Sequence, residues 1–76
     1  MNIQDIDRLL KTNKYIKLKI YGLIYVIEYK DNWYSIYPIE YESRKKSYTS
    51  LSQLLNEYTI YNENLFNNAD RIKLIN

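Results

Sequence analysis

The sequence predicts an α+β fold, with a three-stranded antiparallel meander, an N-terminal helix and one or two C-terminal helices packed on one face of the sheet. Three observations lead to it. The stretch 15–41 is rich in β-branched and aromatic residues that alternate with polar ones, it is divided by two turn signals, and apolar stripes of helical period lie before and after it. We expect residues 1–76 to form a single small domain.

Two tight turns are expected to set the register of the meander. Asp31 and Asn32 both tolerate positive φ and fit a two-residue loop, which places Tyr29 opposite Tyr34. Gly22, the only glycine, would supply the unusual dihedral of a second such loop between the first two strands. The two hairpins are independent of each other, so their agreement tests the prediction.

Both hairpins assign the same residues to the same face, since directly opposed residues share a face. The inner, core face then carries Ile16, Leu18, Ile20, Leu23, Tyr25, Ile27, Tyr29, Tyr34 and Ile36. The outer face is mixed and carries Tyr15, Lys17, Lys19, Ile24, Val26, Glu28, Lys30, Trp33, Ser35, Tyr37 and Ile39. A slip of one residue would put charge into the core, which supports this register.

The first helix is expected to begin after Asn2 as its cap and to run to Lys11. Asp7 and Lys11, four residues apart, would pair on its outer side. Its apolar stripe contains Ile3, Ile6, Leu9 and Leu10.

A capping box, Ser50 to Gln53, predicts a second helix from Leu51. The stripe of this helix, which would lie on the inner face, contains Leu51, Leu54, Leu55 and Tyr58. The sequence leaves the structure of residues 59–76 undecided. Asn62 or Asn64 would cap one more turn carrying Leu65, Phe66 and Ala69, and residues 71–75 alternate like a short closing strand.

The third strand is expected to end near Pro38 and to lie at a sheet edge, because proline cannot donate to a ladder. The charged stretch 40–47 that follows is predicted to be a solvated connection. A functional alternative is that its cations, Arg44, Lys45 and Lys46, bind phosphate or an acidic patch on a partner.

Composition excludes several functions. The chain contains no Cys and no His, which removes disulfides, Cys-based zinc sites and His-dependent nucleophiles. The acidic pairs at 5 and 7 and at 40 and 42 lack a third group to orient a substrate, so we expect no enzyme, no metal and no cofactor. No apolar run is long enough to span a membrane, and we expect an intracellular location, in the cytoplasm of a host cell. Formal net charge is +2, so any nucleic-acid site must be a local patch.

The outer face is the candidate binding surface. Trp33 and Tyr37 fall beside Lys17 and Lys19, and exposed aromatic rings among cations are used both by protein interfaces and by nucleic-acid stacking platforms. The predicted partner-binding residues are Lys17, Lys19, Trp33, Tyr37, Arg44, Lys45 and Lys46. The alternatives are that the tail covers this face, that single-stranded nucleic acid binds it, or that a homodimer forms through it or through the strand of Pro38.

The opening stretch, residues 1–22, resembles the start of small phage-encoded anti-CRISPR inhibitors of type II RNA-guided nucleases. The residues that carry the likeness are Met1, Asn2, Ile3, Asp5, Arg8, Lys11, Tyr15 and Gly22. The resemblance implies a helix, three antiparallel strands and further helices, together with a mobile-element origin. Such inhibitors mimic DNA with clustered acidic side chains, whereas this chain has a formal net charge of +2, so the acidic mechanism does not transfer.

From the residues and the resemblance together we expect a protein-binding inhibitor or adaptor of phage or mobile-element origin. Its partner would be a host protein or ribonucleoprotein complex. The bias of the composition towards Ile, Lys, Asn and Tyr, as in AT-rich coding DNA, agrees with that origin.

Overall fold

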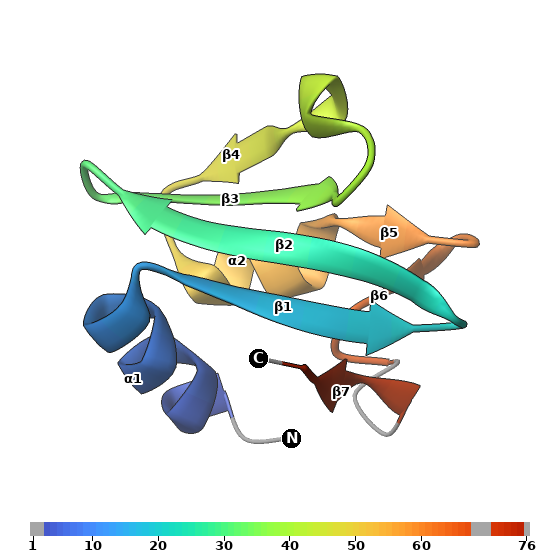
Figure 1. The fold of residues 1–76 in the computed structure, drawn as a ribbon, viewed down its shortest axis with the longest axis horizontal. Coiled ribbons are helices and arrows are strands. Elements are labelled where there is room, and N and C mark those ends of the chain that lie inside the picture. Colours follow the sequence, from blue (N-terminus) through green and yellow to red (C-terminus); the bar gives the residue numbers. More distant parts are fainter. Residues whose placement is uncertain (1–2, 68–70, 76) are drawn as a thin grey trace.

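A computed structural model describes residues 3–67 and 71–75 and confirms the α+β class. The sheet has five antiparallel strands in the order β4-β3-β2-β1-β7, and β5 and β6 form a separate hairpin (Figure 1). The elements are α1 Ile3–Asn13, β1 Tyr15–Ile20, β2 Leu23–Lys30, β3 Trp33–Pro38, the 3₁₀ turn η1 Glu42–Arg44, β4 Lys46–Tyr48, α2 Leu51–Glu57, β5 Thr59–Ile60, β6 Glu63–Asn64 and β7 Lys73–Leu74.

The predicted registers of both hairpins are confirmed. Leu18 lies opposite Tyr25, and Tyr29 lies opposite Tyr34. Each turn has two residues of positive φ, as type I′ turns require, and Gly22 has a φ of +75°. Turn chemistry and alternation were therefore sufficient to place β1, β2 and β3.

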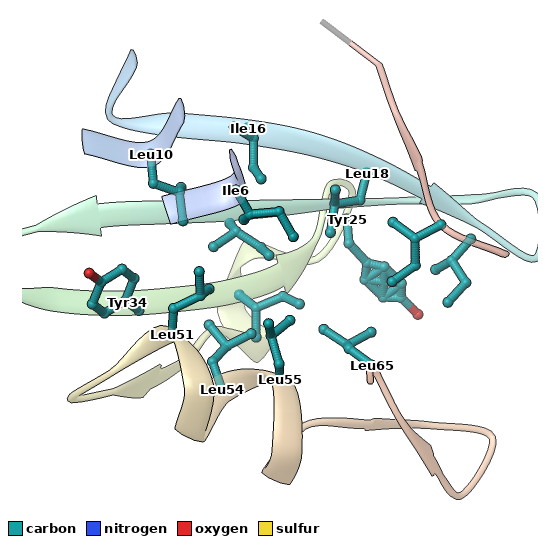
Figure 2. Close-up of a cluster of buried hydrophobic side chains, with 14 of the residues drawn as sticks. Ile6, Leu10, Ile16, Leu18, Tyr25, Tyr34, Leu51, Leu54, Leu55 and Leu65 are labelled. Atoms are coloured by element: carbon teal, nitrogen blue, oxygen red, sulfur yellow. The ribbon is translucent and has the colours of Figure 1, made fainter. Parts of the chain in front are cut away.

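The core lies between the inner face of the sheet and the two helices (Figure 2). The predicted helical stripes bury Ile6 and Leu10 from α1 and Leu51, Leu54 and Leu55 from α2. The strands contribute Ile16, Leu18, Ile20, Tyr25, Ile27, Tyr34 and Ile36. Leu23, predicted to be in the core, is 44% exposed because it directly follows the turn at the end of the sheet.

The predicted edge position of the third strand is wrong. The strand β4 pairs with β3, setting Tyr34 opposite Tyr48 and Ile36 opposite Lys46. Pro38 lies at the end of β3, beyond these pairs, so its missing N–H interrupts no bond to β4. The stretch 40–47 is thus not only a solvated connection, because it contains η1 and most of β4.

The cap of α2 is confirmed in part. The hydroxyl of Ser50 accepts a hydrogen bond of 3.0 Å from the Gln53 backbone N–H. The Gln53 amide oxygen accepts from the backbone and hydroxyl of Thr49, one residue before the position that a capping box uses. The predicted pair between Asp7 and Lys11 is present at 3.3 Å. The predicted cap at Asn2 lies outside the described residues.

The tail closes the sheet, as its alternation predicted. Lys73 and Leu74 of β7 pair with Lys19 and Leu18 of β1. The side chain of Asn64 accepts a hydrogen bond from the Asn67 backbone, so Asn64 begins the predicted extra turn. Ala69, assigned to that turn, lies outside the described residues. The β5–β6 hairpin was not predicted.

Candidate binding surface

A groove of about 900 Å³ runs over the outer face of the sheet. Val26, Glu28 and Tyr37 lie towards the centre of the sheet, on β2 and β3. The segment after β3 adds Glu42 and Lys45 to the lining. The lining also includes Lys14 from the turn after α1, Tyr15 and Lys17 from β1, Lys30 from the end of β2 and Asp31 from the turn after it. A groove of this size, open to solvent, suits a partner's side chains.

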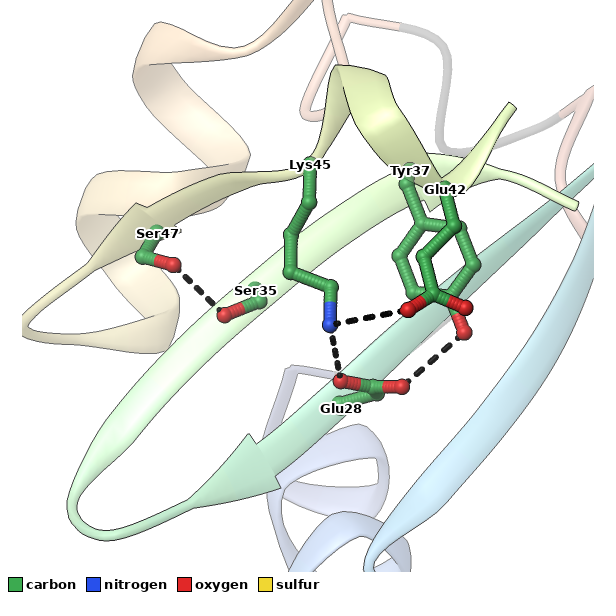
Figure 3. A network of polar contacts seen from close by, with 6 residues as sticks. All are labelled: Glu28, Ser35, Tyr37, Glu42, Lys45 and Ser47. Atoms are coloured by element: carbon green, nitrogen blue, oxygen red, sulfur yellow. Dashed lines mark hydrogen bonds and ion pairs between the residues drawn. The ribbon is translucent and has the colours of Figure 1, made fainter.

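The side of the groove next to η1 is held by a polar network around Glu28 (Figure 3). The Tyr37 hydroxyl donates to one carboxylate oxygen at 2.9 Å, and the Lys45 ammonium donates to the other at 3.0 Å. Lys45 also approaches Glu42 at 3.9 Å. Burial raises the pKa of Glu28, but the hydrogen bonds from Lys45 and Tyr37 outweigh it and hold that pKa below its ordinary value.

Tyr37 was predicted to be exposed on the outer face, but it is buried. Its side chain is 8% exposed, and the ammonium of Lys45 lies 5.1 Å from the centre of its ring. Burial, followed by the hydrogen bond to Glu28, raises the pKa of Tyr37 to about 12. The segment after β3, and not the tail, therefore covers this part of the outer face. The Tyr37 hydroxyl bonds Glu28, and the Tyr37 ring is covered by the protein's own Lys45.

Trp33 is placed as predicted, with 49% of its surface exposed. It lies directly opposite Lys30 on the β2–β3 pair, so a ring and a cation lie side by side on the outer face. Tyr15, at the start of β1, is exposed to a similar degree and lies directly opposite Glu28.

Lys17 and Lys19 both lie on the outer face of β1, as predicted. Lys73 of β7 is directly opposite Lys19, a juxtaposition of like charges that sheets ordinarily avoid. Among the described residues, no carboxylate lies within 4.0 Å of Lys14, Lys17, Lys19, Lys30 or Lys73. Sequence reasoning did not include Lys14 or Lys73, which become part of this surface through the turn after α1 and through β7.

The three cations of the predicted basic loop do not converge. Arg44 lies over the ring of Tyr41, 4.9 Å from its centre, and Lys45 folds back onto Glu28. Lys46 is opposite Ile36 and therefore belongs to the inner side of the sheet. The three residues therefore do not form one cluster, and the binding of phosphate or of an acidic patch that the sequence suggested for them stays a prediction.

Within residues 3–67 and 71–75, no group of three acidic side chains is placed to hold a metal ion. The helices described are too short and too polar to cross a membrane. In the part of the chain that the structure describes, the outer face therefore offers cations without carboxylate partners beside exposed aromatic rings. Comparison of the chain with protein-family models, with curated proteins and with solved structures finds no significant match.

Proposed function

We propose that this chain is a protein-binding inhibitor of phage or mobile-element origin that acts in the host cytoplasm by docking on a defence nucleoprotein, as anti-CRISPR proteins do. The amino-terminal resemblance and the composition support the origin. The binding surface is the outer face of the sheet, with Trp33, Tyr15 and the lysines of the groove.

The observation that carries this proposal is the set of lysines around the groove that have no carboxylate partner among the described residues. Lys45 is already paired with Glu28 and Glu42, whereas Lys14, Lys17 and Lys30 have no carboxylate within 4.0 Å among the described residues. A partner that brings acidic side chains would satisfy them and would be steered towards this face.

Trp33 supplies the apolar part of the contact. Burying a half-exposed indole removes a large aromatic surface from water, and tryptophan is enriched among residues that dominate binding energy. The buried Tyr37 holds the carboxylate of Glu28 in place at this surface through its hydrogen bond.

A homodimer through this face is disfavoured by its own charge. A two-fold contact would bring the same patch of both copies together, and so would place lysines against lysines. Sedimentation of the isolated protein at increasing salt tests this point, and we expect a monomer throughout.

Capture from host lysate with the immobilised protein tests the proposal. We expect Trp33→Ala and Lys17→Glu each to weaken capture of the partner about tenfold or more, because they remove an exposed ring of the outer face and reverse a charge that lines the groove. Phe66→Ala, which removes an exposed ring outside the outer face, is the matched control and should bind as the wild type does. Equal capture by all variants that retain the wild-type circular dichroism would refute the proposal.

Single-stranded nucleic acid is the second candidate, favoured by the Lys19–Lys73 juxtaposition beside Lys17. Phosphate contacts release counterions, so such binding would weaken steeply with salt. Titration of a fluorescent mixed-sequence strand at low salt decides it, and absence of binding at micromolar concentrations removes this candidate.

A further inference from the structure

A second exposed apolar surface lies at one end of the molecule, where the β1–β2 turn, the end of β3 and the β5–β6 turn come together (Figure 1). We call it the turn end and define it by Tyr21, Leu23, Ile39, Tyr41, Tyr61 and Arg44. Its five apolar members all rank among the exposed large hydrophobic residues of the described chain. It shares only Ile39 with the groove of the outer face.

The backbone of this surface carries two unusual residues. Tyr21 and Tyr61 have φ values of +52° and +53°, in the left-handed region that a bulky side chain rarely adopts. Each is the first central residue of its turn, a position where Asn, Asp or Gly is ordinarily found, as Asp31 is in the β2–β3 turn. Strained residues of this kind gather at binding sites, where the surrounding structure holds them in place.

Contacts between the turns hold the two rings. The Tyr21 and Tyr61 rings meet edge to face with centres 5.3 Å apart. Arg71 lies over the Tyr21 ring at 5.6 Å, donates a 2.7 Å hydrogen bond to its hydroxyl and pairs with Glu63 at 3.7 Å. Tyr61 nevertheless leaves 70% of its surface in water. The rings are thus fixed and exposed together, which lowers the entropy lost on binding.

Beside these rings is a depression of about 270 Å³ between the β1–β2 turn and the end of β3. Gly22, Leu23, Pro38 and Ile39 line it, and Gly22 leaves open space where a Cβ would stand. At its rim, Arg44 is stacked over the Tyr41 ring, and no carboxylate of the described residues is within 4.0 Å of its guanidinium.

We infer that the turn end binds a second protein partner, through an apolar side chain of that partner that enters the depression and a neighbouring carboxylate that pairs with Arg44. Tyrosine and arginine around an apolar depression are the composition of interface hot spots. The charge of Arg44 selects the acidic neighbour. A phosphate chain fits less well, because it has no apolar side chain to fill a depression lined by Leu23, Pro38 and Ile39, and because Glu63 already offsets Arg71. This surface adds to the proposed outer-face function and does not depend on it.

Amide chemical-shift titration of the whole protein with the peptide acetyl-Glu-Leu-Leu-Glu-amide tests the inference. We expect saturable shifts at Gly22, Leu23 and Ile39. Arg44→Gln should weaken binding about two- to fivefold, as expected for a charge pair at a solvent-exposed rim. The uncharged peptide acetyl-Gln-Leu-Leu-Gln-amide should bind the wild type more weakly than the acidic peptide does, by the same factor. The two peptides should bind Arg44→Gln with equal affinity.

Tyr61→Asn separates binding from folding, because Asn is favoured at its turn position and the variant should keep the wild-type unfolding midpoint or exceed it. We expect it to lose peptide binding, whereas Lys17→Gln on the outer face should retain it. Three results would overturn the inference: no saturable shifts, tighter binding of a four-nucleotide oligothymidylate at the same residues, or self-association that Tyr61→Asn abolishes, which would make a second copy the occupant.

Discussion

Gly22 illustrates at the residue scale how one backbone angle supports the arrangement of both sheet faces. It has a φ of +75°, and apart from its two neighbours in the chain no atom of the described residues lies within 4 Å of the position that a Cβ would take. Gly22→Ala should therefore lose stability through backbone strain alone, by about 1–2 kcal/mol. Chemical denaturation measures this loss, and a neutral variant would show that the turn is not constrained.

Asn32→Ala provides the comparison for Gly22→Ala. Asn32 has a φ of +68° in a turn of the same type, so the two turns constrain the backbone at these sites in the same way. Asn tolerates this region less well than Gly does, so its replacement by Ala should change the backbone energy less. The variant also loses an exposed hydrogen bond from Tyr29, at 3.1 Å. We expect the smaller loss at Asn32, and the reverse order would contradict the argument.

Tyr34 and Tyr37 make stability depend on alkaline pH. Burial, and then hydrogen bonds to Asp7 and Glu28 respectively, raise each pKa from 10.0 to about 12. The unfolded chain releases these protons first, so the contribution is complete below pH 10 and is lost as pH rises from 10 towards 12. Urea midpoints across that range should fall less for Tyr34→Phe than for the wild type. Parallel profiles would show that Tyr34 does not contribute.

At the scale of elements, Ser50 and Gln53 have different roles at the start of α2, although the predicted capping box gave both of them a bond to the helix backbone. Ser50 bonds the helix backbone itself, whereas Gln53 bonds the exposed Thr49. Ser50→Ala should lower the free energy of unfolding by about 1 kcal/mol, and Gln53→Ala by less. Thermal unfolding of both variants measures the difference. A larger loss for Gln53→Ala would mean that the bonds to Thr49 hold the helix start.

The elements that sequence predicted are those with local signals. Alternation and turn residues are short-range properties, and they were enough for β1, β2, β3 and β7. The strand β4 has only three residues, Lys46 to Tyr48, and becomes a strand because it meets β3. Tyr61 does not look like a turn residue, so the β5–β6 hairpin was also missed.

The same limit explains the outcome for the binding surface. The face that carries Lys17, Lys19 and Trp33 follows from register and was predicted. The burial of Tyr37 was not, because it depends on where the chain after β3 goes and on the long side chain of Lys45, which packs over the ring. No periodic pattern in the sequence predicts that the chain after β3 folds back over Tyr37. None predicted that Lys73 would lie opposite Lys19.

At the scale of the whole molecule, a chain of 76 residues has a total stability of about 4–11 kcal/mol, so single core contacts matter. Leu54 is fully buried between α2 and the sheet, and Leu54→Ala should cost about 2–5 kcal/mol. Trp33→Ala, on the outer face, should stay within about 0.5 kcal/mol of the wild type. Denaturation of both variants tests whether the outer face is separable from the core. A large loss at Trp33 would make it a structural residue.

The position of Trp33 also makes the protein its own optical sensor. It is the only tryptophan among ten tyrosines, and it is half exposed in the folded state. Excitation at wavelengths that tyrosine does not absorb would therefore report on one site. Unfolding should change the emission maximum little, because the indole is already exposed to water in the folded state. A ligand that covers the outer face should shift the emission maximum to shorter wavelength. Occupation of the turn end should leave the spectrum unchanged, so the colour of the emitted light would identify which surface a partner has taken.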